Sequence, residues 1–139
     1  MATTAEYGLG PHTFPRGWFM IATSAEATTT PVAVRYFGED MALYRGESGR
    51  VFLTEAYCPH MGTHLAKNTT SYVVVDKKHV EGDGIRCPYH AWRFGPDGQC
   101  DDIPYSPVKP PKAASRASTK AAAPSLMPLA LPAVTVPSF

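Results

Sequence analysis

The chain has 139 residues, 44% of them hydrophobic and 18% charged, which suits one globular domain with its own core. Its net charge of +1 is unevenly distributed: residues 1–106 carry nine basic and 12 acidic side chains, whereas residues 107–139 carry four basic and no acidic ones. The first part has no dense basic segment, which argues against nucleic acid as a partner. Three cysteines are too few for a disulfide framework.

The chain begins with a segment that we interpret as an arm leading to the folded domain. Residues 1–15 are mostly small and polar, with two glycines and two prolines. They contain neither the basic region nor the apolar region of a secretory signal peptide. We therefore expect a cytoplasmic protein.

Short segments rich in β-branched and aromatic residues follow, separated by turns that contain Gly, Asp or Pro. The expected strands are residues 18–23, 32–37, 41–45, 51–53 and 91–94, and the expected turns are residues 38–40, 46–49 and 95–98. Short strands separated by such turns are typical of an antiparallel meander. No segment shows the apolar periodicity of a helix, so we predict an all-β fold.

Two short segments each combine one cysteine with one histidine: Cys58-Pro59-His60, and Cys87 with His90 in the sequence CPYH. Together they offer two thiolates and two imidazoles. A Rieske [2Fe–2S] cluster requires this set, with two Cys on one iron and two His on the other. In an extended Cys-x-His segment the two side chains lean the same way, so both can reach one small cluster.

A structural zinc site is the alternative interpretation, because two Cys and two His also form a tetrahedral zinc site. Zinc loops more often pair Cys with Cys and His with His, and a helix usually carries the histidines. Here each segment is mixed and lies among expected strands. The pattern therefore favours the iron–sulfur cluster.

The two segments also resemble a known family. Residues 58–65 (CPHMGTHL) and 87–94 (CPYHAWRF) resemble the Rieske signature of terminal oxygenases, the oxygenase components of multi-component hydroxylases. Residues 16–22 resemble the strand that opens their N-terminal domain, and residues 100–105 most resemble the branch of 3-ketosteroid 9α-hydroxylases and cholesterol 7-desaturases. The resemblance covers roughly residues 5–108.

The resemblance implies a Rieske-type antiparallel β-sandwich over residues 16–108, with the cluster loops at one tip. It implies that Cys58 and Cys87 hold a buried iron that stays ferric, and that His60 and His90 hold an outer iron that changes between ferric and ferrous. The implied electron donor is a ferredoxin or a flavin-dependent reductase. The implied acceptor is the catalytic domain of an oxygenase.

Three residues of the motifs also predict the reduction potential. High-potential Rieske proteins of respiratory complexes carry an extra cysteine in each loop and a hydroxyl donor after the second histidine. The corresponding positions here hold Thr63, Tyr89 and Trp92. With fewer hydrogen bonds to the sulfur atoms, the potential should lie at the low end of the Rieske range, roughly −150 mV.

The segment between the two motifs is longer than the family usually carries. Between His60 and Cys87 lie 26 residues, and the excess corresponds to residues 69–84. A strand is expected at residues 72–75 and a tight turn at residues 82–84, so we predict an inserted hairpin or loop. It would either contact a partner or substrate, or be an ordinary surface insertion.

The composition changes after the domain. Residues 107–139 hold seven of the 14 prolines, and we predict that residues 109–139 form a disordered tail rich in Ala, Pro and Ser. Its apolar part contains Pro128, Pro132 and Pro137, so we expect no membrane helix.

Oxygenases of this family also need a second iron, bound by two His and one carboxylate, and no histidine follows His90. We therefore expect the electron-transfer domain of a ring- or steroid-hydroxylating oxygenase, truncated before its mononuclear iron domain and unable to hydroxylate alone. A stand-alone Rieske ferredoxin and a zinc-stabilised interaction module are the alternatives. The segments 16–18 and 103–105 favour the first interpretation over the ferredoxin.

The remaining residues of chemical interest receive structural interpretations. Cys100 is expected to be a free thiol, a common fate for an isolated cysteine. We expect Trp92 to pack beneath the second motif and His64 to be a non-ligand. His12 and His79 are expected to be solvated.

Overall fold

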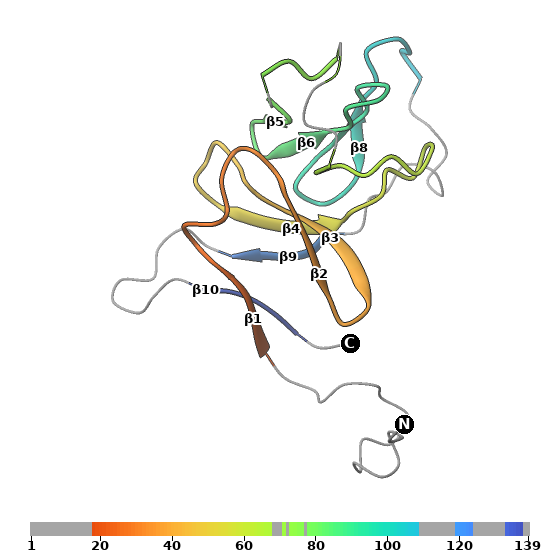
Figure 1. Ribbon diagram of the computed structural model, residues 1–139. Coiled ribbons are helices and arrows are strands. Elements are labelled where there is room, and N and C mark those ends of the chain that lie inside the picture. The colour runs from red at the N-terminus through yellow and green to blue at the C-terminus, as the bar shows by residue number, and fades with distance from the viewer. Residues whose placement is uncertain are drawn as a thin grey trace.

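The computed structural model describes residues 18–67, 71, 73–76, 78–108, 119–123 and 133–137. All ten regular elements within these residues are strands (Figure 1). They are β1 (Trp18–Thr23), β2 (Val32–Tyr36), β3 (Glu39–Arg45), β4 (Val51–Glu55), β5 (Val80–Glu81), β6 (Gly84–Arg86), β7 (Arg93–Phe94), β8 (Cys100–Asp102), β9 (Thr119–Ala123) and β10 (Ala133–Pro137). The prediction of an all-β fold is confirmed.

The strands form three antiparallel sheets. A larger sheet has the order β2-β3-β4-β9, a smaller sheet has the order β5-β6-β7-β8, and β1 pairs with β10. Figure 1 shows the smaller sheet at the upper end of the molecule, above the larger one. The predicted meander is present twice, because β2–β4 and β5–β8 each pair in chain order.

Strands β3 and β4 are buried on both faces and separate two apolar cores. Because side chains alternate along a strand, successive residues enter different cores. Ala42, Tyr44 and Phe52 lie in the upper core, which also contains the two motif cysteines. The lower core contains Ile21, Ala22, Ala27, Met41, Leu43, Val51 and Leu53. Each large side chain buried in this way contributes about 1.5–3 kcal/mol to stability.

A two-residue turn, Gly82-Asp83, connects β5 and β6, with Glu81 paired to Gly84. Gly82 has φ of 61°, the left-handed conformation that this turn needs and that glycine adopts without strain. The tight turn expected in this region is confirmed. That residues 69–84 are an insertion relative to the family stays a prediction.

The turn is held against the larger sheet by hydrogen bonds. The carboxylate of Asp83 accepts from the backbone N–H of Ser48 at 3.1 Å and from its hydroxyl at 2.8 Å. The Tyr44 hydroxyl donates to the Asp83 carbonyl at 3.1 Å, and the Glu47 N–H donates to the Gly82 carbonyl at 2.8 Å. These contacts join the turn before β6 to the turn between β3 and β4.

The strand expected at residues 72–75 is not formed by its described residues. Val73 and Val74 lie in a bend, and Tyr72 is outside the described residues. The Ser71 hydroxyl accepts hydrogen bonds from the N–H groups of Val73 and Val74, at 3.1 and 2.9 Å. This local cap competes with strand pairing, which explains the wrong prediction.

Two strands lie within the segment for which the sequence predicts a disordered tail. The backbone of β9 pairs with β4, and that of β10 pairs with β1. The rest of residues 109–139 lies outside the described residues, as do residues 1–15, so the predictions for these segments stay predictions. The described residues contain no helix with the length and hydropathy of a membrane span.

Gly46 provides a test of the contact between the two sheets. A Cβ on Gly46 would lie 2.3 Å from Oδ1 and 3.0 Å from Cα of Asp83, so the β5–β6 turn would have to move. We expect Gly46→Ala to lower the free energy of unfolding by about 3 kcal/mol, the upper end of the usual cost of overpacking, measured by urea titration. Gly38→Ala is the control, because nothing lies within 4 Å of its Cβ and only its φ of 81° adds a cost, about 1 kcal/mol. An equal loss in both variants would contradict the close contact.

Candidate metal centre

The four sequence-predicted ligands lie on two loops that follow strands of different sheets. Loop 1 (residues 58–63) begins three residues after β4 of the larger sheet, and loop 2 (residues 87–92) joins β6 to β7 of the smaller sheet. Cys58 and Cys87 are the first residues of the two loops, and both side chains lie in the upper core. The structure therefore brings both motifs to the same core.

Loop 1 is closed by two backbone hydrogen bonds. The N–H of Cys58 donates to the carbonyl of Thr63 at 2.9 Å, and the N–H of Gly62 donates to the carbonyl of Cys58 at 2.8 Å. The loop thus turns back on the residue that begins it.

Loop 2 is closed by the same pattern at equivalent positions. The N–H of Cys87 donates to the carbonyl of Trp92 at 2.8 Å, and the N–H of Ala91 donates to the carbonyl of Cys87 at 3.1 Å. The fifth residue of each loop has a positive φ, 70° for Gly62 and 63° for Ala91. Loop 2 therefore adopts with an alanine a conformation that loop 1 adopts with a glycine.

The two thiols are hydrogen-bonded to each other, and each residue is only 2% exposed. The hydrogen bond from Cys58 lowers the pKa of Cys87 to about 6; burial opposes this shift, and the N–H groups of Tyr89 and His90 reinforce it. The same hydrogen bond and burial raise the pKa of Cys58. A thiolate is the form that binds metal, so this buried pair suits one metal ion of a cluster.

The two imidazoles lie together nearer the surface. The ring centroids of His60 and His90 are 5.1 Å apart. His60 is exposed, whereas Nδ1 of His90 is buried with no hydrogen-bond partner among the described residues. A buried polar atom normally has a partner, and an imidazole nitrogen is a common metal ligand. This nitrogen therefore fits a metal ligand.

The donors thus form an inner sulfur pair and an outer nitrogen pair. A Rieske [2Fe–2S] cluster binds two side chains on each of its irons. The residues present fit this group.

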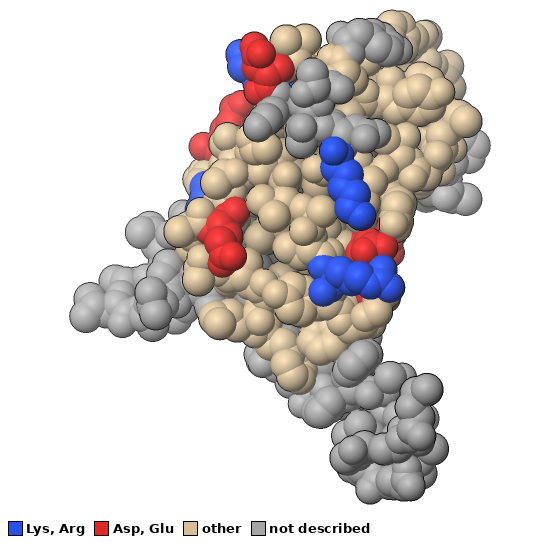
Figure 2. Space-filling view, viewed as in Figure 1, with Lys and Arg blue, Asp and Glu red and all other residues tan. Residues whose placement is uncertain are grey.

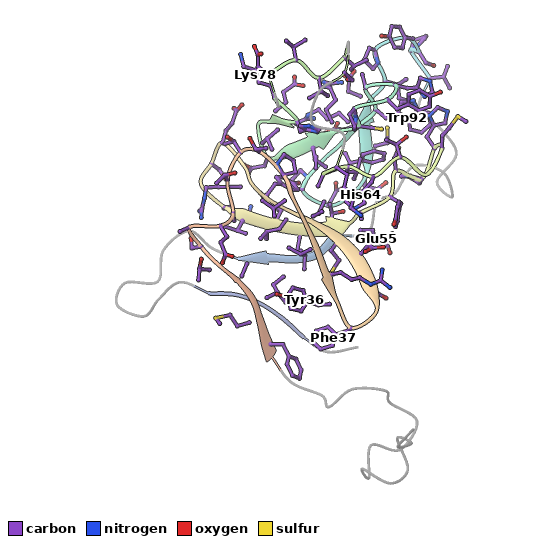
Figure 3. All side chains as sticks on the ribbon, in the orientation of Figure 1. Tyr36, Phe37, Glu55, His64, Lys78 and Trp92 are labelled. Atoms are coloured by element: carbon purple, nitrogen blue, oxygen red, sulfur yellow. The ribbon has the colours of Figure 1, made fainter. Side chains whose placement is uncertain are left out.

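Trp92 packs against the upper core, which contains Cys87 of loop 2, and it also contacts loop 1. Its ring stacks on His60 of loop 1, with centroids 4.2 Å apart and planes 5° from parallel, so it connects the two loops rather than packing only beneath loop 2. In loop 2, the ring centroids of Tyr89 and His90 are 3.8 Å apart. Figure 3 shows Trp92 at the upper end of the molecule and His64 closer to β4.

The remaining histidines and the third cysteine are placed as follows. Nδ1 of His64 accepts a hydrogen bond from the Ala66 N–H at 3.1 Å, so this nitrogen is already used. Cys100 is a buried thiol, as expected, with Sγ 3.7 Å from the Asp102 carbonyl. His79 is fully buried, so the prediction that it is solvated is wrong. Its carbonyl accepts the Arg86 N–H, which extends the β5–β6 pairing and makes this residue part of the folded sheet rather than of an exposed loop. His12 lies outside the described residues.

Arg86, which precedes Cys87, has a role that the sequence did not indicate. It forms ion pairs with Glu81 and Asp102, and its neighbour Arg93 pairs with Asp101. Figure 2 shows that charged side chains form small separate groups on the visible face. An arginine beside a cysteine carries no recognisable sequence signal, so only the folded arrangement reveals these pairs.

The positive φ values of the two loops predict opposite effects of two substitutions. Gly62→Ala should lower stability by about 1 kcal/mol, because a left-handed conformation is unfavourable for alanine. Ala91→Gly should raise it by up to about 1 kcal/mol, because glycine adopts this φ without a steric cost. The two midpoints of urea unfolding, compared with that of the unchanged protein, give the signs. Shifts in the same direction would show that the loops are not equivalent.

Comparison with known proteins identifies the family. The profile of the Rieske [2Fe–2S] domain matches residues 17–117. A cholesterol 7-desaturase from Ciona intestinalis is 40% identical over 97 residues, which are 69% of this chain and 19% of that protein. A 3-ketosteroid-9-alpha-monooxygenase oxygenase component from Rhodococcus rhodochrous is 34% identical over 111 residues, 79% of this chain and 26% of that protein.

Solved structures show the same fold. The terminal oxygenase of carbazole 1,9a-dioxygenase from Novosphingobium sp. KA1 matches with a TM-score of 0.59 and 27% identity, over 76% of this chain and 26% of that one. Dicamba monooxygenase matches with a TM-score of 0.61 and 24% identity, over 78% of this chain and 30% of that one.

The chain spans only 19% of the length of the cholesterol 7-desaturase and 26% of that of the 3-ketosteroid-9-alpha-monooxygenase component. It belongs to the Rieske [2Fe–2S] domain family, its cofactor is a Rieske-type [2Fe–2S] cluster, and its relatives include oxygenase components and cholesterol 7-desaturases.

Proposed function

We propose that Cys58, His60, Cys87 and His90 hold the [2Fe–2S] cluster, and that this domain passes single electrons to the mononuclear iron domain of a ring- or steroid-hydroxylating oxygenase. The observation that supports this most directly is the separation of a buried thiol pair from a more exposed imidazole pair. Because the chain spans 19–26% of the two curated relatives, electron transfer is proposed for the domain and hydroxylation for the whole oxygenase.

The arrangement of the donors suits electron transfer. When bound, the cluster accepts and releases one electron, and neutral imidazoles make reduction of the outer iron easier than thiolates would. The two thiols lie inside the upper core, so the end of the cluster that they would bind is away from water. The N–H groups of His60 and Met61 stabilise negative charge on Cys58, as those of Tyr89 and His90 do on Cys87. The chain's own backbone therefore offsets part of the charge of the thiolates.

The surface beside the imidazoles supports a role in contacting redox partners. Met61, which directly follows His60, is 62% exposed, and Tyr89, which directly precedes His90, is 48% exposed. The proposed donor is a ferredoxin or a flavin-dependent reductase, and the proposed acceptor is an oxygenase catalytic domain. Weak redox encounters use small interfaces, for which such a limited apolar surface is sufficient.

Substitution of the proposed ligands tests the assignment. We expect His60→Ala and His90→Ala to lose most of the bound iron and the EPR signal of the reduced cluster, because each removes one of two protein ligands on the outer iron. Cys87→Ala should do the same. The matched controls are His64→Ala and Cys100→Ala, which should keep both.

Elemental analysis and EPR of the purified protein measure these outcomes. Unchanged iron content and colour after either histidine substitution would refute the ligand assignment. A colourless protein that contains zinc would refute the cluster itself.

The reduction potential is a second test of the proposal. Trp92, at the position where respiratory Rieske proteins have a serine, stacks on His60 and offers no hydroxyl to the sulfur atoms. We therefore expect a midpoint at the low end of the Rieske range, roughly −150 mV, in a redox titration followed by EPR. A midpoint above about +100 mV would show that the hydrogen bonds around the cluster have been misjudged.

A further inference from the structure

Arg86 connects loop 2 to the smaller sheet. It is the last residue of β6 and directly precedes Cys87. Its Nη1 donates to the carbonyl oxygen of Ala91 in loop 2 at 2.6 Å. The same side chain is only 16% exposed, so this hydrogen bond is largely shielded from water.

Two carboxylates hold the guanidinium group in place. Oε2 of Glu81, on β5, lies 2.5 Å from Nη2 and 3.1 Å from Nε of Arg86. Oδ2 of Asp102, on β8, lies 2.9 Å from Nη1. A guanidinium bonded on several edges has few alternative orientations. The donor that reaches Ala91 is therefore fixed by strands on both sides of β6.

Ala91 is the residue whose conformation needs such support. Its φ of 63° is left-handed, and it is 3% exposed. Loop 1 has Gly62 at the equivalent position, where this conformation carries no steric cost. A strained residue keeps its conformation only when its surroundings restrain it. Arg86 on the carbonyl and Cys87 on the N–H of Ala91 restrain both of its backbone polar groups.

We propose that Arg86 is a positioning residue that holds Ala91 in the left-handed conformation and thereby orients the preceding residue, His90, toward the cluster. The inference rests on the proposed function, because it assigns His90 as a ligand. Loop 1 reaches the same shape by using glycine, whereas loop 2 reaches it by using the arginine that ends the preceding strand, β6.

Arg93 offers a matched control. It is also an arginine of the smaller sheet, next to β6, and it forms an ion pair with Asp101 and hydrogen bonds to the Glu81 carbonyl. These contacts join β7 to β8 and β5 rather than to Ala91. Removing its charge changes the sheet in a similar way without removing the bond to loop 2.

The experiment measures how fast the purified holoprotein loses its visible absorption to an excess of an iron chelator, together with the EPR spectrum of the reduced cluster. Arg86→Gln should lose the cluster roughly tenfold faster and show altered g-values, because the strained conformation of Ala91 is no longer restrained on its carbonyl side. Arg93→Gln should stay within about twofold of the unchanged protein. Adding Ala91→Gly to Arg86→Gln should restore the slow rate, because glycine needs no restraint.

Three results would overturn the inference: an unchanged rate in Arg86→Gln, an equal acceleration in Arg93→Gln, or a double variant as fast as Arg86→Gln alone. If Arg86→Gln does not fold, the same comparison with Arg86→Lys, which keeps the charge but not the forked donors, decides the question. A wild-type protein that lacks a [2Fe–2S] signal would instead contradict the proposed function and the inference together. A normal wild-type cluster with no effect of Arg86 contradicts the inference alone.

Discussion

The shared backbone closure of the two loops is the constraint on which the candidate site depends. In each loop the carbonyl of the cysteine accepts from the N–H four positions later, and its N–H donates to the carbonyl five positions later. The chain therefore turns around the sulfur. N–H groups that follow each cysteine then point at its sulfur and stabilise a thiolate. Two such loops facing one core bring together two thiols that are 29 residues apart in the sequence. The proposed ligands are thus positioned mainly by backbone hydrogen bonds.

The rigidity of the central β3–β4 pair supports this arrangement from below. Both faces of these strands are packed, with one core beneath the loops and the other against residues of β1. Tyr44 and Phe52 stack at 5.3 Å in the upper core, beside the cysteines. Loop 1 follows β4 closely, so movement of its cysteine would disturb this packing. A well-packed interior resists such displacement.

The sequence was sufficient to predict the two motifs and the strand pattern because both depend on local information. Alternating apolar residues and Gly-containing turns are sufficient to predict β2, β3 and β4, and the Cys-His spacing is sufficient to predict the motifs. The sequence did not reveal one local hydrogen-bonded cap and one contact between distant segments. The Ser71 cap replaces a strand at Val73 and Val74, and the stacking of Trp92 on His60 depends on how the two loops meet.

Arg86 and Ala91 illustrate the same limit. Nothing in the sequence shows that Ala91 is left-handed or that Arg86 reaches its carbonyl, because the first depends on loop closure and the second on the positions of Glu81 and Asp102. His79 was predicted to be solvated because it lies in the segment expected to be an inserted loop, whereas its backbone pairs with Arg86 and its side chain is buried.

The origin of the two loops in different sheets has a further consequence. Loop 1 leaves the larger sheet and loop 2 belongs to the smaller one, while the Asp83–Ser48 contact ties the sheets together at another point. An inorganic centre held by both loops would act as a cross-link between the two halves of the domain. Maturation and folding would then be coupled, since the free energy of metal binding contributes to folding when the site spans separate parts of the chain.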